Sequence, residues 1–322
     1  MKNTLTLIFF LTIDILSTQK NPQKQPVELG KVNWNRDYYQ AVENAKNEEK
    51  GILILFQEVP GCATCQHYGS KALSHPLIVE AIESEFVPLA IFNNNEGHDA
   101  EILSLYNEPS WNNPVVRIVS ANGTNLVPRV SGDYSSKGLV NAMRAALIRQ
   151  NRPIPEYLNL LNEELSKISK KKAETEYFKM YCFWSGEKHF GKAQGVVSAK
   201  AGFMGGNEVV KVQYDPNFID REELIEYAKK GKCQSVKNSG FRFSNKDHLF
   251  YLRGTEYKYL PLTEFQKIKI NTALGSHQDP QAYLSPQQKV WLQQTQNNQI
   301  KKIELIDEDI NSAWWVRKRL SE

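Results

Sequence analysis

Three short apolar runs mark the first half of the chain. Residues 52–56 and 86–92 are apolar throughout, and residues 115–119 are apolar at all but one position. Runs of this length suit strands, and unbroken apolarity is typical of a strand buried on both faces. The third run is followed by Asn122-Gly123, a dipeptide that favours a tight hairpin turn. We therefore predict three strands here, the last of which enters a hairpin.

Segments with helical periodicity lie between and around these runs. Apolar residues recur at helical spacing in residues 37–46, from Cys65 to Glu85, in residues 102–106 and in residues 138–148. Strands and helices are thus expected to alternate through the first half of the chain.

Cys62 and Cys65 stand at CxxC spacing directly after the first apolar run. This spacing suits either a redox dithiol or half of a metal site, and a metal site needs further Cys or His ligands. No second CxxC is present, and His67 and His75 are isolated in the sequence. The preceding strand favours the dithiol. We therefore predict a redox pair, with no metal site and no cofactor.

The order of strand, CxxC, helix, strand, helix, proline, hairpin strand and helix resembles the thioredoxin family over residues 33–150. The resemblance implies a thioredoxin-like α/β domain. In that family the proline before the hairpin strand is cis and lies against the redox disulfide, so Pro114 is the cis-proline candidate. Residues 58–61, Glu-Val-Pro-Gly, replace the tryptophan-containing approach of typical thioredoxins. Partner specificity and redox potential are therefore expected to differ.

Length and charge narrow the function classes. The 322 residues suffice for two domains with separate cores. Hydrophobic content of 41% and charged content of 24% are ordinary for a soluble globular protein. A net charge of +4 is mild and spread along the chain, so we expect no nucleic-acid partner. Four cysteines are too few for a disulfide-stapled scaffold and suit redox catalysis better.

The N-terminus has the layout of a secretory signal. Lys2 precedes a mainly apolar run over residues 5–16, and polar residues follow. The run is short for a membrane span. We predict a signal peptide or membrane anchor over residues 1–19 and a linker over residues 20–32. The protein is expected to be exported, periplasmic or at the cell surface, with any membrane contact made through this segment.

A second unit follows a charged, helix-compatible connector over residues 151–175. Its first landmark is residues 181–187, Tyr-Cys-Phe-Trp-Ser-Gly-Glu, which place a cysteine at the predicted start of a helix. The positive end of the helix dipole lowers the pKa of a thiol there and raises its thiolate fraction. Cys182 is therefore a candidate nucleophile, and Glu187 is expected on the helix surface.

Further landmarks keep a fixed spacing after Cys182. They are Gly195-Val196, Gly205-Gly206, a strand-like run from Glu208 to Tyr-Asp-Pro at 214–216, and a helix over residues 221–230. The series resembles the A class of peptide methionine sulfoxide reductases, and we assign residues 176–284 to this domain. The resemblance implies an α+β domain of ferredoxin-like topology. It also implies a peptide-methionine (S)-S-oxide reductase with a disulfide as acceptor.

The residues of this series suit sulfoxide reduction. The reaction needs a thiolate, a proton donor for the leaving oxygen and a pocket for the methyl group. Cys182 would supply the thiolate, and Phe183 with Trp184 would supply aromatic surface for a thioether. Glu208 corresponds to the acidic residue of the family. Burial would raise its pKa and keep it protonated near neutrality, as a general acid requires.

The chain departs from the family pattern around this pocket. Tyr181 and Ser185 stand where the family has glycines, and Phe203 stands where it has a tyrosine. A longer family loop after the two glycines is reduced to Asn207, which removes one of two tyrosines that donate to the substrate oxygen.

The second pocket tyrosine has two candidates. Tyr257 lies in Gly-Thr-Glu-Tyr-Lys at residues 254–258, which is similar to the Gly-Thr-Gln-Tyr-Arg of the family. Tyr251 is the alternative if the register follows Asp247. That aspartate is either the family's aspartate near the tyrosine or a turn residue.

Cys233 is the remaining thiol of the second domain. After oxygen transfer Cys182 would be a sulfenic acid, which condenses with a nearby thiol. The lysines among residues 229–232 would favour a Cys233 thiolate. Cys62 is the alternative partner, through thiol–disulfide exchange.

Residues 285–322 form a predicted helical C-terminal tail. Ser285 before Pro286 suits a helix N-cap followed by proline at the first position. Trp314-Trp315 is expected to anchor the tail to a core.

These features favour a two-domain oxidoreductase that reduces methionine sulfoxide, peptide-bound or free, and so repairs exported proteins under oxidative stress. The dithiol of Cys62 and Cys65 would be a built-in reductant, because covalent linkage raises its local concentration to about the millimolar range. An external thiol reductant would then reset it. Two alternatives stay open: an interaction protein that holds a Met-containing or metal-bearing partner, and a thiol-disulfide oxidoreductase in which only the first domain is active.

Overall fold

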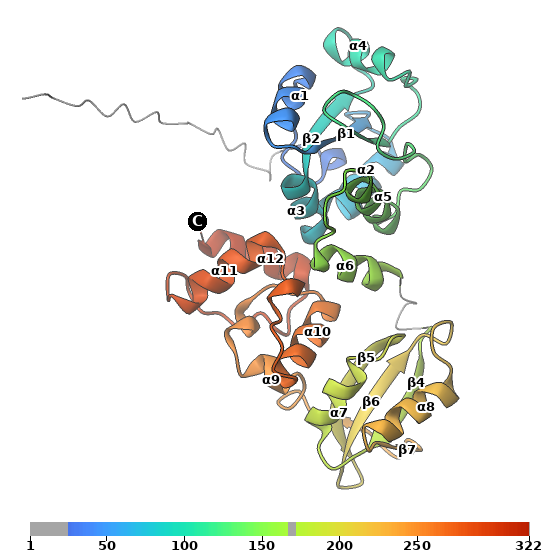
Figure 1. Cartoon of the computed structure of the whole chain (residues 1–322), viewed down its shortest axis with the longest axis vertical. Helices are drawn as coiled ribbons and strands as arrows, with labels where there is room; N and C mark the ends of the chain where they lie inside the picture. Colours follow the sequence, from blue (N-terminus) through green and yellow to red (C-terminus); the bar gives the residue numbers. More distant parts are fainter. Residues whose placement is uncertain (1–24, 167–171, 322) are drawn as a thin grey trace, which may run out of the picture.

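The computed structural model describes residues 25–166 and 172–321, which form two sheets with flanking helices and a set of C-terminal helices (Figure 1). The signal peptide or anchor predicted over residues 1–19 lies outside the described residues. Among the helices that are described, none combines the length and the apolar character needed to cross a membrane.

The first sheet has three strands in the order β2-β1-β3. β1 (Gly51–Gln57) pairs in parallel with β2 (Phe86–Phe92) and antiparallel with β3 (Val115–Val119). The three apolar runs are therefore strands, as predicted. Helices cover both faces of this sheet: α1 (Tyr38–Asn47) and α4 (His98–Leu105) on one, and α2 (Ala63–Lys71), α3 (Pro76–Glu85) and α5 (Ser136–Arg149) on the other.

The stretch of helical periodicity expected from Cys65 to Glu85 is helical, but it is divided between two helices. α2 ends at Lys71, a 3-10 turn (Ala72–Ser74) follows, and α3 begins at Pro76. Proline has no backbone N–H and pushes the residue before it out of the helical region, so it fits only the first turn of a new helix. His75 accordingly has an extended backbone, with φ −70° and ψ 122°.

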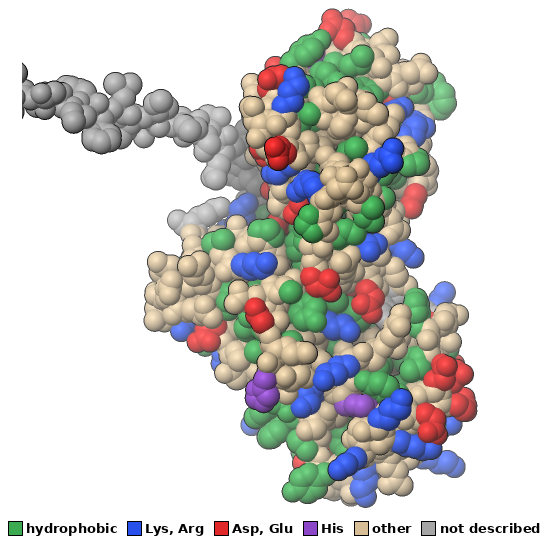
Figure 2. All heavy atoms as spheres, viewed as in Figure 1, with side chains coloured by type: hydrophobic (Ala, Val, Ile, Leu, Met, Phe, Trp, Pro, Cys, Tyr) green, Lys and Arg blue, Asp and Glu red, His purple; other side chains and the backbone are tan. Residues whose placement is uncertain are grey.

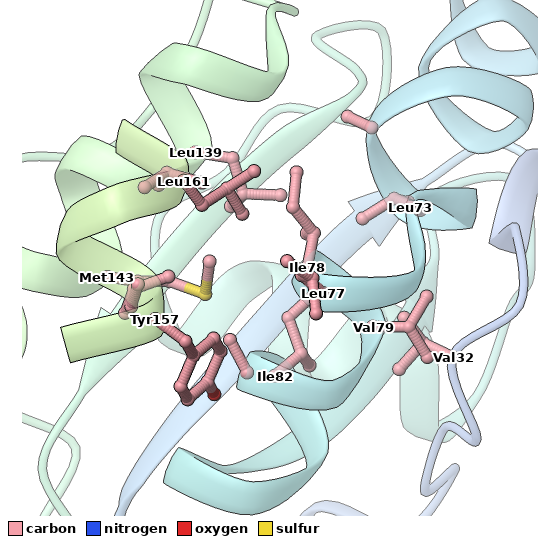
Figure 3. Close-up of a cluster of buried hydrophobic side chains, with 14 of the residues drawn as sticks. Val32, Leu73, Leu77, Ile78, Val79, Ile82, Leu139, Met143, Tyr157 and Leu161 are labelled. Carbon is pink, nitrogen blue, oxygen red and sulfur yellow. The ribbon is translucent and has the colours of Figure 1, made fainter. Parts of the chain in front are cut away.

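The first core extends to α6 (Glu156–Ser166), which packs against the thioredoxin-like domain. Met143 of α5 and Tyr157 of α6 lie opposite Ile78 and Ile82 of α3 (Figure 3). The start of the connector between the two predicted domains is thus fixed to the first of them.

The second sheet is antiparallel, with the strand order β7-β4-β6-β5-β8. Its strands are β4 (Glu174–Lys179), β5 (Val196–Met204), β6 (Asn207–Tyr214), β7 (Gln234–Val236) and β8 (Arg242–Phe243). Two helices complete the unit: α7 (Phe183–Phe190) follows β4, and α8 (Arg221–Lys230) follows β6. The order β4-α7-β5-β6-α8-β7 is the ferredoxin-like βαββαβ arrangement.

Residues 174 and 175 belong to the strand β4, although they were expected in the helical connector. Pairing with β6 and specific partners overrides the local composition. Tyr214 donates its hydroxyl to Glu174 at 2.7 Å, and Arg221 forms an ion pair with Glu176 at 2.6 Å.

A two-residue turn joins β5 to β6. Met204 pairs with Asn207, and Gly205 and Gly206 between them have φ of 55° and 79°. A tight hairpin turn of this kind needs positive φ at both central residues, which glycine supplies at little steric cost. The shortened loop after Gly206 is therefore a closed hairpin in this chain.

The C-terminal helices pack against the first domain. They are α9 (Phe250–Arg253), the 3-10 turn η3 (Glu256–Tyr259), α10 (Glu264–Gly275), α11 (Pro286–Gln296) and α12 (Ile310–Ser321). Leu260, Trp291 and Trp314 belong to the same buried cluster as Leu77 of α3. Ser285 caps α11 by accepting from the backbone of Gln288, as predicted.

The tryptophan pair anchors this tail as predicted. Trp314 is buried and packs edge to face on Trp291 at a centroid distance of 4.8 Å. α10 in turn contacts α7, where Lys188 Nζ donates to the carbonyl of Gly275 at 3.0 Å. The C-terminal helices thus contact both sheet domains (Figure 1).

Basic and acidic side chains are interspersed over the face shown in Figure 2. This distribution agrees with the mild net charge of +4.

Candidate functional site

Cys62 and Cys65 meet at the N-terminus of α2. Cys62 is the N-cap residue and is exposed, whereas Cys65 lies one turn into the helix and is buried. Their sulfur atoms are 3.5 Å apart, and both are free thiols. The predicted dithiol therefore has one accessible and one shielded sulfur.

The surroundings of the two sulfurs separate their acidities. Hydrogen bonds from the backbone and side chain of Cys65 lower the pKa of Cys62. Burial, reinforced by Cys62, raises the pKa of Cys65 to about 12. Cys62 is therefore the more readily deprotonated sulfur of this pair, and the thiolate is the reactive form of a thiol.

The Asn113–Pro114 peptide bond is cis, as predicted. It holds Asn113 beside the dithiol, and Cys65 donates its S–H to Asn113 Oδ1 at 2.8 Å. The Val59–Pro60 bond on the other side of the dithiol is also cis.

Sequence reasoning missed two polar residues under the dithiol. Glu28 is buried, and its carboxylate accepts from the backbone N–H of Gly61 at 2.9 Å. Gln57 at the end of β1 donates to the carbonyls of Glu28 and Cys65. The only available signal was a glutamine that ends a fully apolar strand; nothing local marked Glu28.

Cys182 is the N-cap residue of α7, at the predicted helix start. It is half-buried and follows Tyr181, which is 99% exposed. The thiol predicted as nucleophile is therefore partly accessible at the start of α7.

Glu208 lies next to Cys182. Its Oε2 accepts from the backbone N–H of Phe183 at 2.8 Å, and its carbonyl accepts from the N–H of Met180 at 3.2 Å. The side chain is half-buried. The structure thus joins the predicted nucleophile and the predicted acid through the first residue of α7.

Aromatic rings surround this turn. Phe183 is buried and packs edge to face on Phe203 at a centroid distance of 5.3 Å. Trp184 is stacked on Phe250, with centroids 3.7 Å apart and planes at 11°. Phe250 was not predicted from the sequence.

Tyr257 and Asp247, which were predicted to bind the substrate, have their own surroundings. Tyr257 is buried in the cluster that the C-terminal helices share with the first domain, and this burial raises its pKa to about 12. Asp247 accepts from the hydroxyl of Ser244 at 2.6 Å in a turn. Tyr251, the alternative, lies against Gly275 with Lys188 over its ring.

Glu187 was expected on the helix surface, and this is wrong. It is only 3% exposed and accepts hydrogen bonds from the backbones of Ala201 and Leu249 at 2.7 and 3.0 Å. His248 Nδ1 is 2.5 Å from the same carboxylate. Three partners compensate the burial of this charge, and all three are distant in sequence.

Cys233 is buried, which corrects the expectation that neighbouring lysines favour its thiolate. Burial raises its pKa to about 11. Its position does bring it toward Cys182: it precedes Gln234, which pairs with Lys179, and Cys182 lies three residues beyond Lys179. Both thiols therefore lie near the same end of the sheet.

The two redox centres lie in different parts of the molecule. Cys62 precedes α2, and Cys182 precedes α7. These two helices are separated along the long axis of the molecule (Figure 1). α6 and α10 lie between them in this view. Among the described residues, no group of three or more His, Cys, Asp or Glu side chains could hold a metal ion.

A dithiol at the start of a thioredoxin-like helix, and a second helix-capping thiol beside a carboxylate, define a two-domain thiol redox protein. Each half of the chain is similar to known proteins. A thioredoxin-like family model matches residues 33–121. A solved DsbH oxidoreductase, 18% identical, covers 41% of this chain and 95% of its own, with a TM-score of 0.32.

The second half is similar to proteins named peptide methionine sulfoxide reductase MsrA. The relative from Methanococcus maripaludis (strain C6 / ATCC BAA-1332) is 33% identical over 123 residues, 31% of this chain and 76% of its own. The relative from Vibrio vulnificus (strain CMCP6) is 30% identical over 168 residues, 47% of this chain and 76% of its own. This chain belongs to the MsrA family of peptide methionine sulfoxide reductases, and it carries a thioredoxin-like domain in front of the family domain.

Proposed function

We propose that this protein reduces methionine sulfoxide, peptide-bound or free, with Cys182 as nucleophile and Glu208 as proton donor. The observation that supports this best is their meeting at the first turn of α7, where Glu208 accepts from Phe183 at 2.8 Å. A thiolate at Cys182 can attack the sulfoxide sulfur, and a carboxyl group can deliver a proton to the departing oxygen.

The oxygen passes from the substrate to the enzyme. The Cys182 thiolate attacks the sulfoxide sulfur, and the oxygen, protonated from Glu208, ends on Cys182 as a sulfenic acid. The substrate sulfur is reduced by two electrons to the thioether, and the Cys182 sulfur is oxidised by two. Proton uptake from solvent restores Glu208.

A second thiol then removes the oxygen as water. Condensation of the sulfenic acid with Cys233 forms a Cys182–Cys233 disulfide; Cys62 is the alternative partner. The Cys62 thiolate attacks this disulfide and forms a mixed disulfide with the second domain. Cys65 then attacks the mixed disulfide, which releases the thiol of the second domain and leaves an oxidised Cys62–Cys65 pair. An external thiol reductant resets that pair. Since the two centres lie apart, this exchange needs a changed domain arrangement or a second molecule.

The test is turnover of a methionine sulfoxide peptide by the reduced full chain, followed by chromatography of the methionine product. With dithiothreitol, Cys182→Ser is expected to lose activity and Cys62→Ser to keep it. With a protein thiol reductant, Cys62→Ser is expected to lose activity as well. Absence of turnover with excess dithiothreitol would refute the reductase.

A second candidate function is thiol–disulfide exchange by the first domain alone. The complete geometry at Cys62 and Cys65, with one exposed sulfur of lowered pKa, favours it. Reduction of a disulfide substrate such as insulin, retained by Cys182→Ser and lost by Cys62→Ser, would support this function.

We infer export from the apolar pattern of residues 1–19, and secretion of a tagged full chain would test it.

A further inference from the structure

Phe250 covers one face of the aromatic surface beside Cys182. Its ring and that of Trp184 are 3.7 Å apart and nearly parallel, at 11°. A methyl thioether placed between two rings needs about 7 Å, since each carbon contact takes about 3.5–4 Å. Phe250 and a substrate methyl group therefore cannot share this face of Trp184.

α7 itself holds Phe250 in place. Trp184 and Glu187 are three residues apart on α7 and so lie on the same side of that helix. Glu187 accepts from the backbone N–H of Leu249 at 3.0 Å and contacts His248 Nδ1 at 2.5 Å. The helix that presents Trp184 thus also clamps the turn that carries Phe250.

The clamped turn has a backbone conformation that leucine rarely adopts. Leu249 has φ 58° and ψ 41°, in the left-handed region. Such conformations persist where surrounding contacts hold them, and they are concentrated at ligand clamps and switch regions. The strained residue directly precedes the ring that covers Trp184.

Trp184 also carries a hydrogen-bond donor. Trp184 Nε1 is buried and has no partner within the described residues. Buried donors are nearly always paired, and a sulfoxide oxygen is an acceptor of suitable size. Phe250, by contrast, is 40% exposed, so its ring has a route outward.

We propose that Phe250 is the gate of the Cys182 site and that an entering methionine sulfoxide displaces it from Trp184. The inference rests on the proposed reductase function and adds a specificity residue to it. An entering substrate then replaces the contact between Phe250 and Trp184 with its own contact to Trp184.

Phe250→Ala is expected to lower KM for a methionine sulfoxide peptide about two- to tenfold, the strength of one aromatic pair, with kcat unchanged. Phe250→Leu keeps apolar bulk but cannot stack. Its KM is expected to lie between those of wild type and Phe250→Ala. Phe218→Ala, which removes an exposed ring (51%) outside this turn, serves as control. An unchanged or raised KM in both Phe250 variants would overturn the gate.

A binding measurement does not depend on turnover. The probe is N-acetylmethionine sulfoxide amide, titrated into fluorotryptophan-labelled protein, with the Trp184 fluorine signal assigned by its loss in Trp184→Phe. Phe250→Ala is expected to bind about two- to tenfold more tightly than wild type. Equal or weaker binding overturns the gate. Tighter binding without methionine formation in any variant supports the gate and counts against the proposed reductase.

Discussion

Cys62 and Cys65 carry the same functional group, and their surroundings shift the two pKa values in opposite directions. Hydrogen bonds lower the pKa of Cys62, while burial raises that of Cys65 to about 12. At pH 7 iodoacetamide is expected to alkylate Cys62 and leave Cys65 unmodified, because a thiol five pH units below its pKa is about one part in 10⁵ thiolate. Peptide mass spectrometry over pH 6–10 measures both sites. Comparable labelling of both at pH 7 would contradict the assignment of Cys62 as nucleophile.

Cys233 is expected to act slowly as a resolving thiol. Burial holds its pKa at about 11, so its thiolate fraction rises about tenfold per pH unit up to that value. After one equivalent of methionine sulfoxide, the Cys182 sulfenic acid should therefore be trapped by dimedone at pH 7 and disappear faster at pH 9. The measurement uses Cys62→Ser, which excludes exchange with the first domain.

Cys233→Ser in the same background is the matched control for that prediction. It is expected to preserve the sulfenic acid at both pH values. A lifetime that is the same with and without Cys233 would show that another group resolves Cys182.

At the scale of elements, the sequence predicted the positions of the strands more accurately than the contacts between side chains. The strand spans 86–92 and 115–119 and the helix 221–230 are observed at the predicted residues, because apolar runs and helical periodicity are local properties. Glu187 shows what the sequence could not predict. A glutamate on a helix is expected to be exposed unless its partners are known. Those partners, at positions 201, 248 and 249, are brought to it only by the tertiary fold.

Glu187 provides the prediction at this scale. Glu187→Ala would leave the buried backbone donors of Ala201 and Leu249 unpaired, at about 1–3 kcal/mol each. The free energy of unfolding in urea is expected to fall by on the order of 3 kcal/mol. Glu187→Gln keeps an acceptor oxygen and should lose less.

Glu222→Ala is the control for this loss. Glu222 is largely exposed on α8, and surface substitutions of this kind usually change stability by less than about 0.5 kcal/mol. If Glu187→Ala were no more destabilising than Glu222→Ala, the clamp on the turn that carries Phe250 would not contribute to the fold.

At the scale of the molecule, the C-terminal helices determine how the two domains are joined. The sequence predicted Ser285 as an N-cap and Trp314 as an anchor, but it did not specify which core they join. Long-range packing places Tyr257 in that shared core. A motif match gives a residue's neighbours in sequence, and the position of this tyrosine depends instead on helices that follow it.

Two half-buried titratable groups lie where α11 and α12 approach α3. Glu80 accepts from Ser285 Oγ at 2.5 Å and from the backbone of Gln287, and burial raises its pKa to about 7. Burial lowers the pKa of His75 to about 4, against the opposing influence of Asp309. The folded protein thus holds a proton on Glu80 that the unfolded chain releases, and it excludes from His75 a proton that the unfolded chain binds.

These two groups are expected to give opposite pH dependences that nearly cancel between pH 4.5 and 6.5. The contribution of Glu80 is present below its ordinary pKa of 4.5 and is lost as pH rises to about 7. That of His75 is present above its ordinary pKa of 6.5 and is lost as pH falls to about 4. Glu80→Gln should therefore gain stability with rising pH relative to wild type, by about 1 kcal/mol per pH unit, and His75→Gln should show the reverse. Urea unfolding at pH 4.5, 5.5 and 6.5 measures the three slopes, and equal slopes would mean that neither group titrates differently on folding.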